Sequence, residues 1–170
     1  MTQITILRTG LANLASVTAA FRRLGADIVV ADDADTISEA TRLVVPGVGA
    51  YGEAMNRLGA AGLVSPLRDR IADGRPTLGI CLGLQIFGTG SDESPGVSGL
   101  GCVSAMTTGF DVMLTSPQMG WNRVTPTDNA VLCESGYAYF ANSFRFERIP
   151  AGWAGATANY GGPMVAALER

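Results

Sequence analysis

The 170-residue sequence contains neither histidine nor lysine, and only 16% of its residues are charged. Histidine is the side chain that titrates near neutral pH and serves most often as a general base, so any catalytic hypothesis has to do without it. The twelve basic residues are all arginines, they form no basic run, and the net charge is −3. We therefore expect no nucleic-acid partner and no membrane-surface partner.

No apolar stretch approaches the ~20 residues needed to cross a bilayer, and the N-terminus lacks a basic region followed by a long apolar core. We therefore expect a cytoplasmic protein. Three widely spaced cysteines, Cys81, Cys102 and Cys133, favour free thiols over a disulfide framework or a zinc site. The length and the apolar content of 47% predict a single folded domain over residues 1–170 rather than a disordered chain.

Strand and helix patterns alternate in the first half of the chain. Short β-branched runs predict strands, and apolar residues at helical spacing between them predict helices. The strands are continuously apolar, as a sheet covered on both faces requires, and the connections favour parallel pairing. An α/β fold with a doubly wound, mainly parallel sheet is therefore predicted. The predicted strands are 4–7, 28–30, 43–45 and 77–80, with an acidic turn at 32–35, and the predicted helices are 14–24, 53–58, 63–73 and 84–87.

The second half of the chain has a different texture. Short strand candidates are separated by clusters of Gly, Pro, Asp and Asn, with little helical periodicity between them. We interpret this half as an antiparallel extension of the sheet. The candidates are 101–104, 123–125, 139–144, 154–158 and 165–168.

The most informative stretch is Gly-Ile-Cys-Leu-Gly-Leu-Gln at 79–85, where an apolar strand meets a cysteine between small residues and then an apolar helix. This pattern is typical of a nucleophile elbow, in which flanking glycines let the chain bend tightly below the nucleophile. A helix N-terminus next to Cys81 favours the thiolate, and the N–H of Leu82 can face an oxyanion. The alternative is a buried structural cysteine on a tight strand-to-helix turn.

A second glycine-rich stretch, Pro-Gly-Val-Gly-Ala-Tyr-Gly at 46–52, follows a predicted strand and precedes a predicted helix. It formally matches a dinucleotide fingerprint, but it follows the third strand, and Asp73 lies at a helix end rather than at a strand end where it could hold a ribose. The favoured interpretation is that its backbone N–H groups lie near Cys81 and supply a second oxyanion donor.

Three separated motifs together resemble those of the class I glutamine amidotransferases: Pro-Gly-Val-Gly at 46–49, the Cys81 segment at 79–85, and Pro-Gln-Met-Gly-Trp-Asn at 117–122. Shorter pieces at 13–14, 94–97, 139–144 and 160–163 support the resemblance, which covers essentially the whole chain. The Met-Gly-Trp-Asn piece is most similar to one branch, the glutaminase subunits of imidazole glycerol phosphate synthase. The resemblance implies a flavodoxin-like, doubly wound glutamine amidotransferase domain.

The resemblance also implies a role for individual positions. Cys81 would attack the side-chain amide of L-glutamine to form a thioester and release ammonia, without a cofactor or a metal. The oxyanion donors would be Leu82, Val48 and Gly49, and the glutamine-binding residues would be Gly47, Gln85, Ser143 and Phe144. A cyclase subunit with a (β/α)₈ barrel would be the heterodimer partner, contacted by Asn13, Met119, Trp121 and Asn122. Taken alone, Gln85 suits a polar helix position, and Met119 and Trp121 suit a core.

One departure from the family separates two hypotheses. Members continue into a strand with Gln-Phe-His-Pro-Glu, whose His and Glu complete the catalytic triad, whereas these 170 residues have no histidine. We expect a C-terminally truncated copy of an active glutaminase, with apolar sheet surface exposed and prone to self-association. The alternative is an inactive module that only binds the cyclase. A cysteine hydrolase or redox sensor with the same elbow is a third hypothesis, which leaves the 119–122 motif unexplained.

Overall fold

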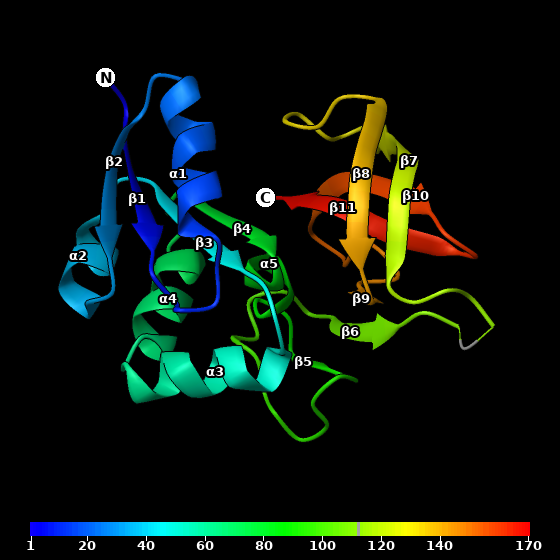
Figure 1. Cartoon of the computed structure of the whole chain (residues 1–170), viewed down its shortest axis with the longest axis horizontal. Coiled ribbons are helices and arrows are strands. Elements are labelled where there is room, and N and C mark those ends of the chain that lie inside the picture. The colour runs from blue at the N-terminus through cyan, green and yellow to red at the C-terminus, as the bar shows by residue number, and fades with distance from the viewer. Residues whose placement is uncertain (112) are drawn as a thin grey trace.

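A four-stranded parallel sheet forms the first half of the computed structural model, which describes residues 1–111 and 113–170 (Figure 1). Its strands are β1 (Gln3–Leu7), β2 (Asp27–Ala31), β3 (Leu43–Gly47) and β4 (Thr77–Cys81), in the order β2-β1-β3-β4. Every pairing is parallel, and the register places Gly47 of β3 beside Cys81 of β4. All four strands predicted from the first half of the sequence are confirmed.

Five helices connect and cover these strands: α1 (Leu14–Arg23), α2 (Ala34–Glu39), α3 (Tyr51–Ala60), α4 (Val64–Ala72) and α5 (Leu82–Gln85). The sequence pattern missed α2, because the acidic residues at 32–35 were interpreted as a turn. Asp33 is the N-cap of this helix, and its carboxylate accepts a hydrogen bond of 2.8 Å from the N–H of Thr36. This bond lowers the pKa of Asp33. An acidic turn and the start of a short helix therefore look alike in sequence.

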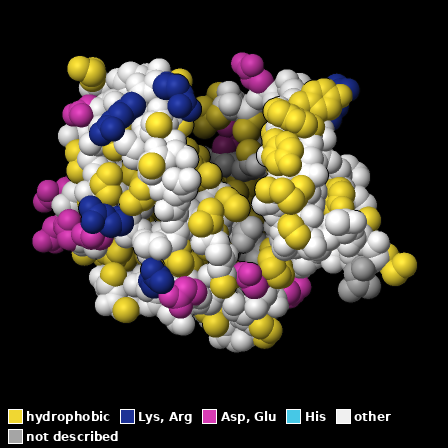
Figure 2. Space-filling view, in the orientation of Figure 1, with side chains coloured by type: hydrophobic (Ala, Val, Ile, Leu, Met, Phe, Trp, Pro, Cys, Tyr) yellow, Lys and Arg dark blue, Asp and Glu magenta, His cyan; other side chains and the backbone are white. Residues whose placement is uncertain are grey.

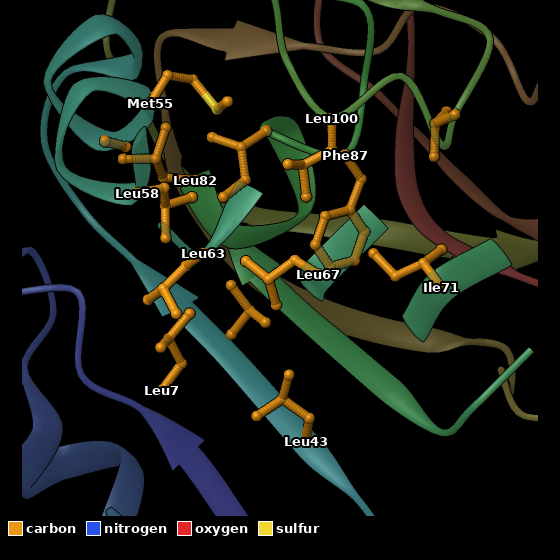
Figure 3. Packing of buried hydrophobic residues seen from close by; sticks show 14 of the residues in the cluster. Leu7, Leu43, Met55, Leu58, Leu63, Leu67, Ile71, Leu82, Phe87 and Leu100 are labelled. Atoms are coloured by element: carbon orange, nitrogen blue, oxygen red, sulfur yellow. The ribbon is translucent and has the colours of Figure 1, made fainter. Parts of the chain in front are cut away.

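The apolar core lies on one face of the parallel sheet, between the sheet and helices α2, α3 and α4 (Figure 3). Leu7, Leu43 and Val45 point into it, as do residues of the helices and of the segment after α5. Ile6 and Val44 alternate with them and are buried on the opposite face, toward α1. The sheet is therefore covered on both faces near its centre, as the continuously apolar strands predicted.

The edge strand β4 is not covered on one of its faces. Leu78 and Ile80, which share one face of this strand, are 49% and 36% exposed. Helix α1 packs chiefly against β2, at the opposite edge of the sheet. The expectation of exposed apolar sheet surface is confirmed at these two residues, and self-association through this edge stays a prediction.

The second half of the chain forms an antiparallel sheet of its own, in the order β11-β10-β7-β8. Its strands are β7 (Gln118–Pro126), β8 (Gly136–Asn142), β10 (Ala154–Asn159) and β11 (Pro163–Glu169). A smaller sheet joins β5 (Gly90–Ser91), β6 (Met106–Gly109) and β9 (Phe144–Arg145). Four of the five predicted strands of this half are thus confirmed, but they pair with one another and do not extend the ladder of the parallel sheet.

The strand predicted at 101–104 is wrong. The N–H groups of Leu100, Gly101 and Val103 donate to carbonyls of residues 86–88, so this backbone packs against the segment that follows α5. Gly101 has φ +71°, a conformation that ends an extended run. The nearest strand, β6, begins at Met106.

A buried arginine ties the helical layer to the sheet. Arg70 of α4 is 2% exposed, and its guanidinium donates to the carbonyls of Ile37, Ala40 and Pro76 and to the hydroxyl of Thr77. Burial, and then the neighbouring charge of Arg75, lower the pKa of this guanidinium. The buried guanidinium is therefore held by neutral acceptors rather than by a carboxylate.

We expect Arg70→Leu to lower the free energy of unfolding by about 2 kcal/mol, because it removes the hydrogen bonds that this buried guanidinium donates to α2 and β4 and leaves the buried Ile37 carbonyl without that donor. Urea denaturation measures the change. Arg22→Leu, at an exposed position of α1, serves as the control and should change stability by less than about 0.5 kcal/mol. Equal effects of the two substitutions would contradict the role assigned to Arg70.

Candidate active site

Cys81 lies at the carboxyl end of β4 and is the N-cap residue of α5. It has φ +55° and ψ −116°, and it is the one non-glycine residue with a positive φ among those that the structure describes. Such a conformation costs about 1–3 kcal/mol and persists only where the surrounding structure enforces it. The thiol is exposed, so the alternative of a buried structural cysteine is wrong.

Glycines on three neighbouring segments allow this conformation. A Cβ on Gly79 would lie 2.7 Å from the carbonyl oxygen of Gly83, and a Cβ on Gly47 would lie 2.9 Å from the N–H nitrogen of Gly83. A Cβ on Gly83 would overlap the carbonyl oxygen of Val45. Backbone therefore packs directly on backbone where β3, β4 and α5 meet, as expected for a nucleophile elbow.

The helix after Cys81 is very short, since α5 has only four residues, 82–85. It begins two residues before the predicted range, 84–87. A single turn provides little of the macrodipole of a long helix. What remains near the thiol is the set of N–H groups of the first turn, which have no intrahelical acceptors. Among these, the N–H of Leu82 is the closest in sequence to Cys81.

The loop after β3 has an unexpected contact. The N–H of Val48 donates a hydrogen bond of 2.6 Å to the carbonyl of Leu11, in the loop between β1 and α1. In this conformation the Val48 N–H is therefore bound to a protein acceptor, whereas the sequence prediction assigned it to an oxyanion. Gly49, with φ +95°, follows directly and forms the turn of this loop.

The predicted glutamine-binding residues come together from two distant parts of the chain. The side chain of Gln85 in α5 donates to the carbonyl of Phe144 in β9, with 3.4 Å between nitrogen and oxygen. Ser143 lies between β8 and β9, beside Phe144. Figure 2 shows a hollow between the two halves of the molecule, and Figure 1 places the β4–α5 junction beside it.

Two side chains that support this loop were not predicted to do so: Glu93 was not singled out in the sequence, and Ser94 was noted only as part of the piece at 94–97. The Glu93 carboxylate accepts a 2.7 Å hydrogen bond from the N–H of Tyr51, and the Ser94 hydroxyl accepts a 3.0 Å bond from the N–H of Gly52. The N-cap residue of α3, Ala50, has no side chain able to cap the helix. The one available signal in the sequence was this missing cap, since the two partners lie 42 residues away.

The other two cysteines have different surroundings. Burial raises the pKa of the Cys102 thiol, an effect that Arg68 and Arg170 partly oppose. Burial and the charge of Glu169 raise the pKa of the Cys133 thiol. Cys102 lines a cavity of about 600 Å³ with Arg68, and none of the predicted site residues lies in that cavity. The raised pKa values disfavour the nucleophilic thiolate at both positions.

An exposed apolar face covers the front of β7 and β8. Met119, Trp121, Tyr137 and Tyr139 point to the same side of the strand pair and are 53–70% exposed. The rings of Trp121 and Tyr139 meet edge to face, with centroids 5.7 Å apart. This aromatic face appears as the yellow cluster over β7 and β8 in Figure 2. Contiguous exposed aromatics of this kind mark interaction surfaces.

Two predicted partner-facing residues lie elsewhere. Asn122 is on the opposite side of β7 from Met119 and Trp121, and its side chain donates to the carbonyl of Asn159. Asn13 is exposed and is the N-cap of α1, where it accepts a hydrogen bond from the N–H of Ser16. The structure therefore groups Met119 and Trp121 with two tyrosines rather than with Asn122.

Comparison with known sequences gives one consistent result. The model of the family "Glutamine amidotransferase class-I" matches residues 7–154. The chain is 41% identical over 170 residues to "Imidazole glycerol phosphate synthase subunit HisH" of Methanothermobacter thermautotrophicus, covering 98% of this chain and 84% of the relative. It is 40% identical to the protein of the same name from Pectobacterium atrosepticum, and 34% identical to that from Bacillus subtilis. These alignments cover 99% and 93% of this chain and 86% and 79% of the relatives.

Solved structures agree on the fold. A "Crystal structure of glutamine amidotransferase" superposes with a TM-score of 0.77 at 17% identity, covering 98% of this chain and 84% of that one. A putative GMP synthase subunit from Thermoplasma acidophilum superposes with a TM-score of 0.64 at 18% identity and covers 100% of this chain and 78% of that one. In the described part of the molecule, no helix is long and apolar enough to cross a membrane.

Proposed function

Because the chain belongs to the class I glutamine amidotransferases, we propose that it is the glutaminase subunit of an imidazole glycerol phosphate synthase. It hydrolyses glutamine to glutamate and supplies the ammonia to a cyclase subunit in histidine biosynthesis. The observation that carries this proposal is the exposed Cys81 in its strained conformation beside Gly47, where the register of β3 and β4 places it. The 170 residues act as one glutamine amidotransferase domain, since the core joins both halves of the chain.

The proposed reaction has two covalent steps. The Cys81 sulfur attacks the side-chain amide carbon of glutamine, and the carbon–nitrogen bond breaks with release of ammonia. Water then cleaves the thioester, which yields glutamate and restores the thiol. We assign the oxyanion to the N–H groups of Leu82 and Gly49, and to that of Val48 once it leaves the carbonyl of Leu11.

We assign substrate binding to the residues that flank the thiol. Gln85 and Phe144 already touch through a hydrogen bond, and Ser143 lies next to them. Gly47 lies directly beside Cys81, where a side chain would meet the backbone of α5. The substrate set is therefore Gly47, Gln85, Ser143 and Phe144, drawn from both halves of the molecule.

A specific observation favours one alternative function. The proton transfers of this reaction need a general base, and the 170 residues contain no histidine. The alternative is a module that binds the cyclase but forms no glutamate. Both functions require the same fold and the same partner, and they differ only in whether glutamate is formed.

Turnover and labelling together test the proposed function. An electrophilic glutamine analogue should label Cys81 in preference to Cys102 and Cys133, whose thiols have raised pKa values. The assembled complex with the cyclase should convert glutamine to glutamate. Equal labelling of the three thiols in the folded protein would contradict the glutaminase proposal. Selective labelling of Cys81 with no glutamate formed would favour the silent module.

We assign the docking of a (β/α)₈-barrel cyclase, as a heterodimer, to the aromatic face of β7 and β8. Its centre, with Trp121 packed against Tyr139, has the composition of an interface hot spot. The three cysteines are free thiols, which is typical of a reducing compartment, and we therefore assign the protein to the cytoplasm.

Trp121→Ala should weaken binding of the cyclase by about 2 kcal/mol, or roughly 30-fold in Kd. Trp121 is 70% exposed, so stability should change little. Isothermal titration calorimetry measures the affinity. Met113→Ala, an exposed methionine outside the aromatic face, is the control and should leave Kd unchanged. If both variants bind as tightly as the unmodified chain, the assignment of this face is wrong.

A further inference from the structure

Two arginine side chains from distant parts of the chain line one cavity of about 600 Å³. Arg68 comes from α4, and Arg170 directly follows β11. The segment 98–102, which ends at the half-buried Cys102, forms another part of the wall. Sites for small molecules have volumes of roughly 300–1,000 Å³. The two guanidinium groups therefore border a space that a small ligand can fill.

Each guanidinium is held by a contact that leaves other N–H groups available. The Nε atom of Arg68 donates a hydrogen bond of 2.9 Å to the carbonyl of Leu100, so the two terminal nitrogens of this group remain free to bind a ligand. The guanidinium of Arg170 lies over the ring of Trp153, 4.6 Å from the ring centroid. Stacking of this kind leaves the N–H groups at the edge of the guanidinium open. Both side chains are thus ordered in advance, which lowers the entropic cost of binding.

The cavity is positively charged although the protein as a whole is acidic. The net charge is −3, yet no Asp or Glu side chain lines this cavity. Neither guanidinium forms a salt bridge with any residue that the structure describes. The charges of Arg68 and Arg170 both act to lower the pKa of the Cys102 thiol, against the larger opposite effect of burial. Two cations that share one cavity without a counter-charge favour an anionic ligand.

Two guanidinium groups suit a phosphate group better than a carboxylate. One guanidinium fork binds two oxygens at once and already engages both oxygens of a carboxylate. A phosphate group has further oxygens for the second guanidinium and carries nearly two negative charges at pH 7. The hydroxyls of Thr89 and Ser98 also line the cavity and can donate to the same group.

We propose that this cavity is a binding site for a phosphate group, either free phosphate or the phosphate of a small monoester, held by Arg68 and Arg170. None of the residues assigned above to catalysis, glutamine binding or docking lines the cavity, so the inference stands apart from the proposed function. A bound phosphate joins α4 to the end of β11 and thereby ties the first half of the chain to the second.

Isothermal titration calorimetry of the full chain with potassium phosphate measures this binding, at an ionic strength held constant with potassium chloride. We expect a saturable signal that potassium chloride alone does not give. Arg68→Gln removes one guanidinium and should weaken phosphate binding by at least about tenfold. Arg148→Gln, at an exposed position that lines a different cavity, is the matched control and should leave Kd unchanged.

The same titration with ribose 5-phosphate distinguishes the two sources of the phosphate group. Tighter binding of the monoester than of inorganic phosphate would identify a phosphorylated small molecule as the ligand, because the cavity then also contacts the rest of that molecule. Tighter binding of inorganic phosphate would identify the free ion. Either result supports a phosphate site.

The Cys102 thiol reports where the phosphate binds. A dianion beside this thiol offsets the two arginine charges and raises the pKa of Cys102, so alkylation by iodoacetamide should slow saturably as phosphate is added. Cys133 does not line the cavity and is the internal control, whose alkylation rate should not change.

The absence of saturable binding, an equal response to potassium chloride, or unchanged affinity in Arg68→Gln would each overturn the site. Equal slowing of alkylation at Cys102 and Cys133 would also count against it. If Arg68→Gln does not fold, Arg170→Gln removes the second guanidinium and should cause a similar loss. Failure of the glutamine analogue to label Cys81 selectively would contradict the proposed function alone and leave the phosphate measurement valid.

Discussion

Replacement of Cys81 by serine is expected to lower glutamine hydrolysis by a factor on the order of 10⁴ or more. A hydroxyl is a much weaker nucleophile than a thiol without a strong base beside it, and these 170 residues contain no histidine. The substitution is nearly isosteric and Cys81 is exposed, so stability should be unchanged. Glutamate formation in the complex with the cyclase is the measurement, and thermal unfolding checks the fold.

Cys133→Ser is the matched control for this experiment. Cys133 is half-buried, and both burial and Glu169 raise the pKa of its thiol, so it should not take part in the reaction. Its substitution should leave turnover within about twofold, because it removes no group that touches the substrate. A Cys81→Ser variant that keeps a large part of the activity would exclude the thioester route.

Gly83→Ala is expected to have the largest effect on stability. The new methyl group would overlap the carbonyl oxygen of Val45, which is backbone in the centre of the sheet and cannot rotate away. We expect a loss of about 3 kcal/mol in the free energy of unfolding. The shift of α5 away from β3 should also displace Cys81 and reduce labelling by the glutamine analogue. Urea denaturation and labelling rates measure the two effects.

Gly59→Ala provides the matched control within α3. A Cβ at this position meets no atom within 4 Å, and the glycine is helical. Alanine here should raise stability by about 0.5–1 kcal/mol, because it reduces the entropy of the unfolded chain. If Gly83→Ala proved as harmless as Gly59→Ala, close backbone packing would not be what shapes the elbow.

The strands of the parallel sheet and the elbow at Cys81 were predictable because their signals are local. A run such as Leu43–Val45 is apolar whatever surrounds it, and glycines two residues before and after a cysteine indicate a tight bend. The similarity to class I glutamine amidotransferases was carried by short contiguous motifs and is confirmed by the comparisons. Helix α2 was not predicted, because a helix start capped by Asp33 and an acidic turn have the same local composition.

The availability of individual polar groups was not predictable in the same way. Val48 looked like an oxyanion donor, but its N–H bonds to Leu11, which is 37 positions earlier in the chain. Asn122 was expected beside Trp121 on the partner face, yet the alternation of β7 turns it inward. Glu93 caps α3 across 42 residues. Each of these contacts depends on where a segment distant in the sequence lies in the folded chain.

The sequence alone determined the α/β class and the family and singled out Cys81 as the candidate nucleophile, because apolar runs, glycine spacing and motifs act over a few neighbouring residues. Only the tertiary structure decided which N–H groups near Cys81 are free and that the antiparallel strands form a separate sheet. These features are hydrogen-bond pairings between distant segments. A backbone or amide group has one set of donors and acceptors, and the folded chain alone selects its partner.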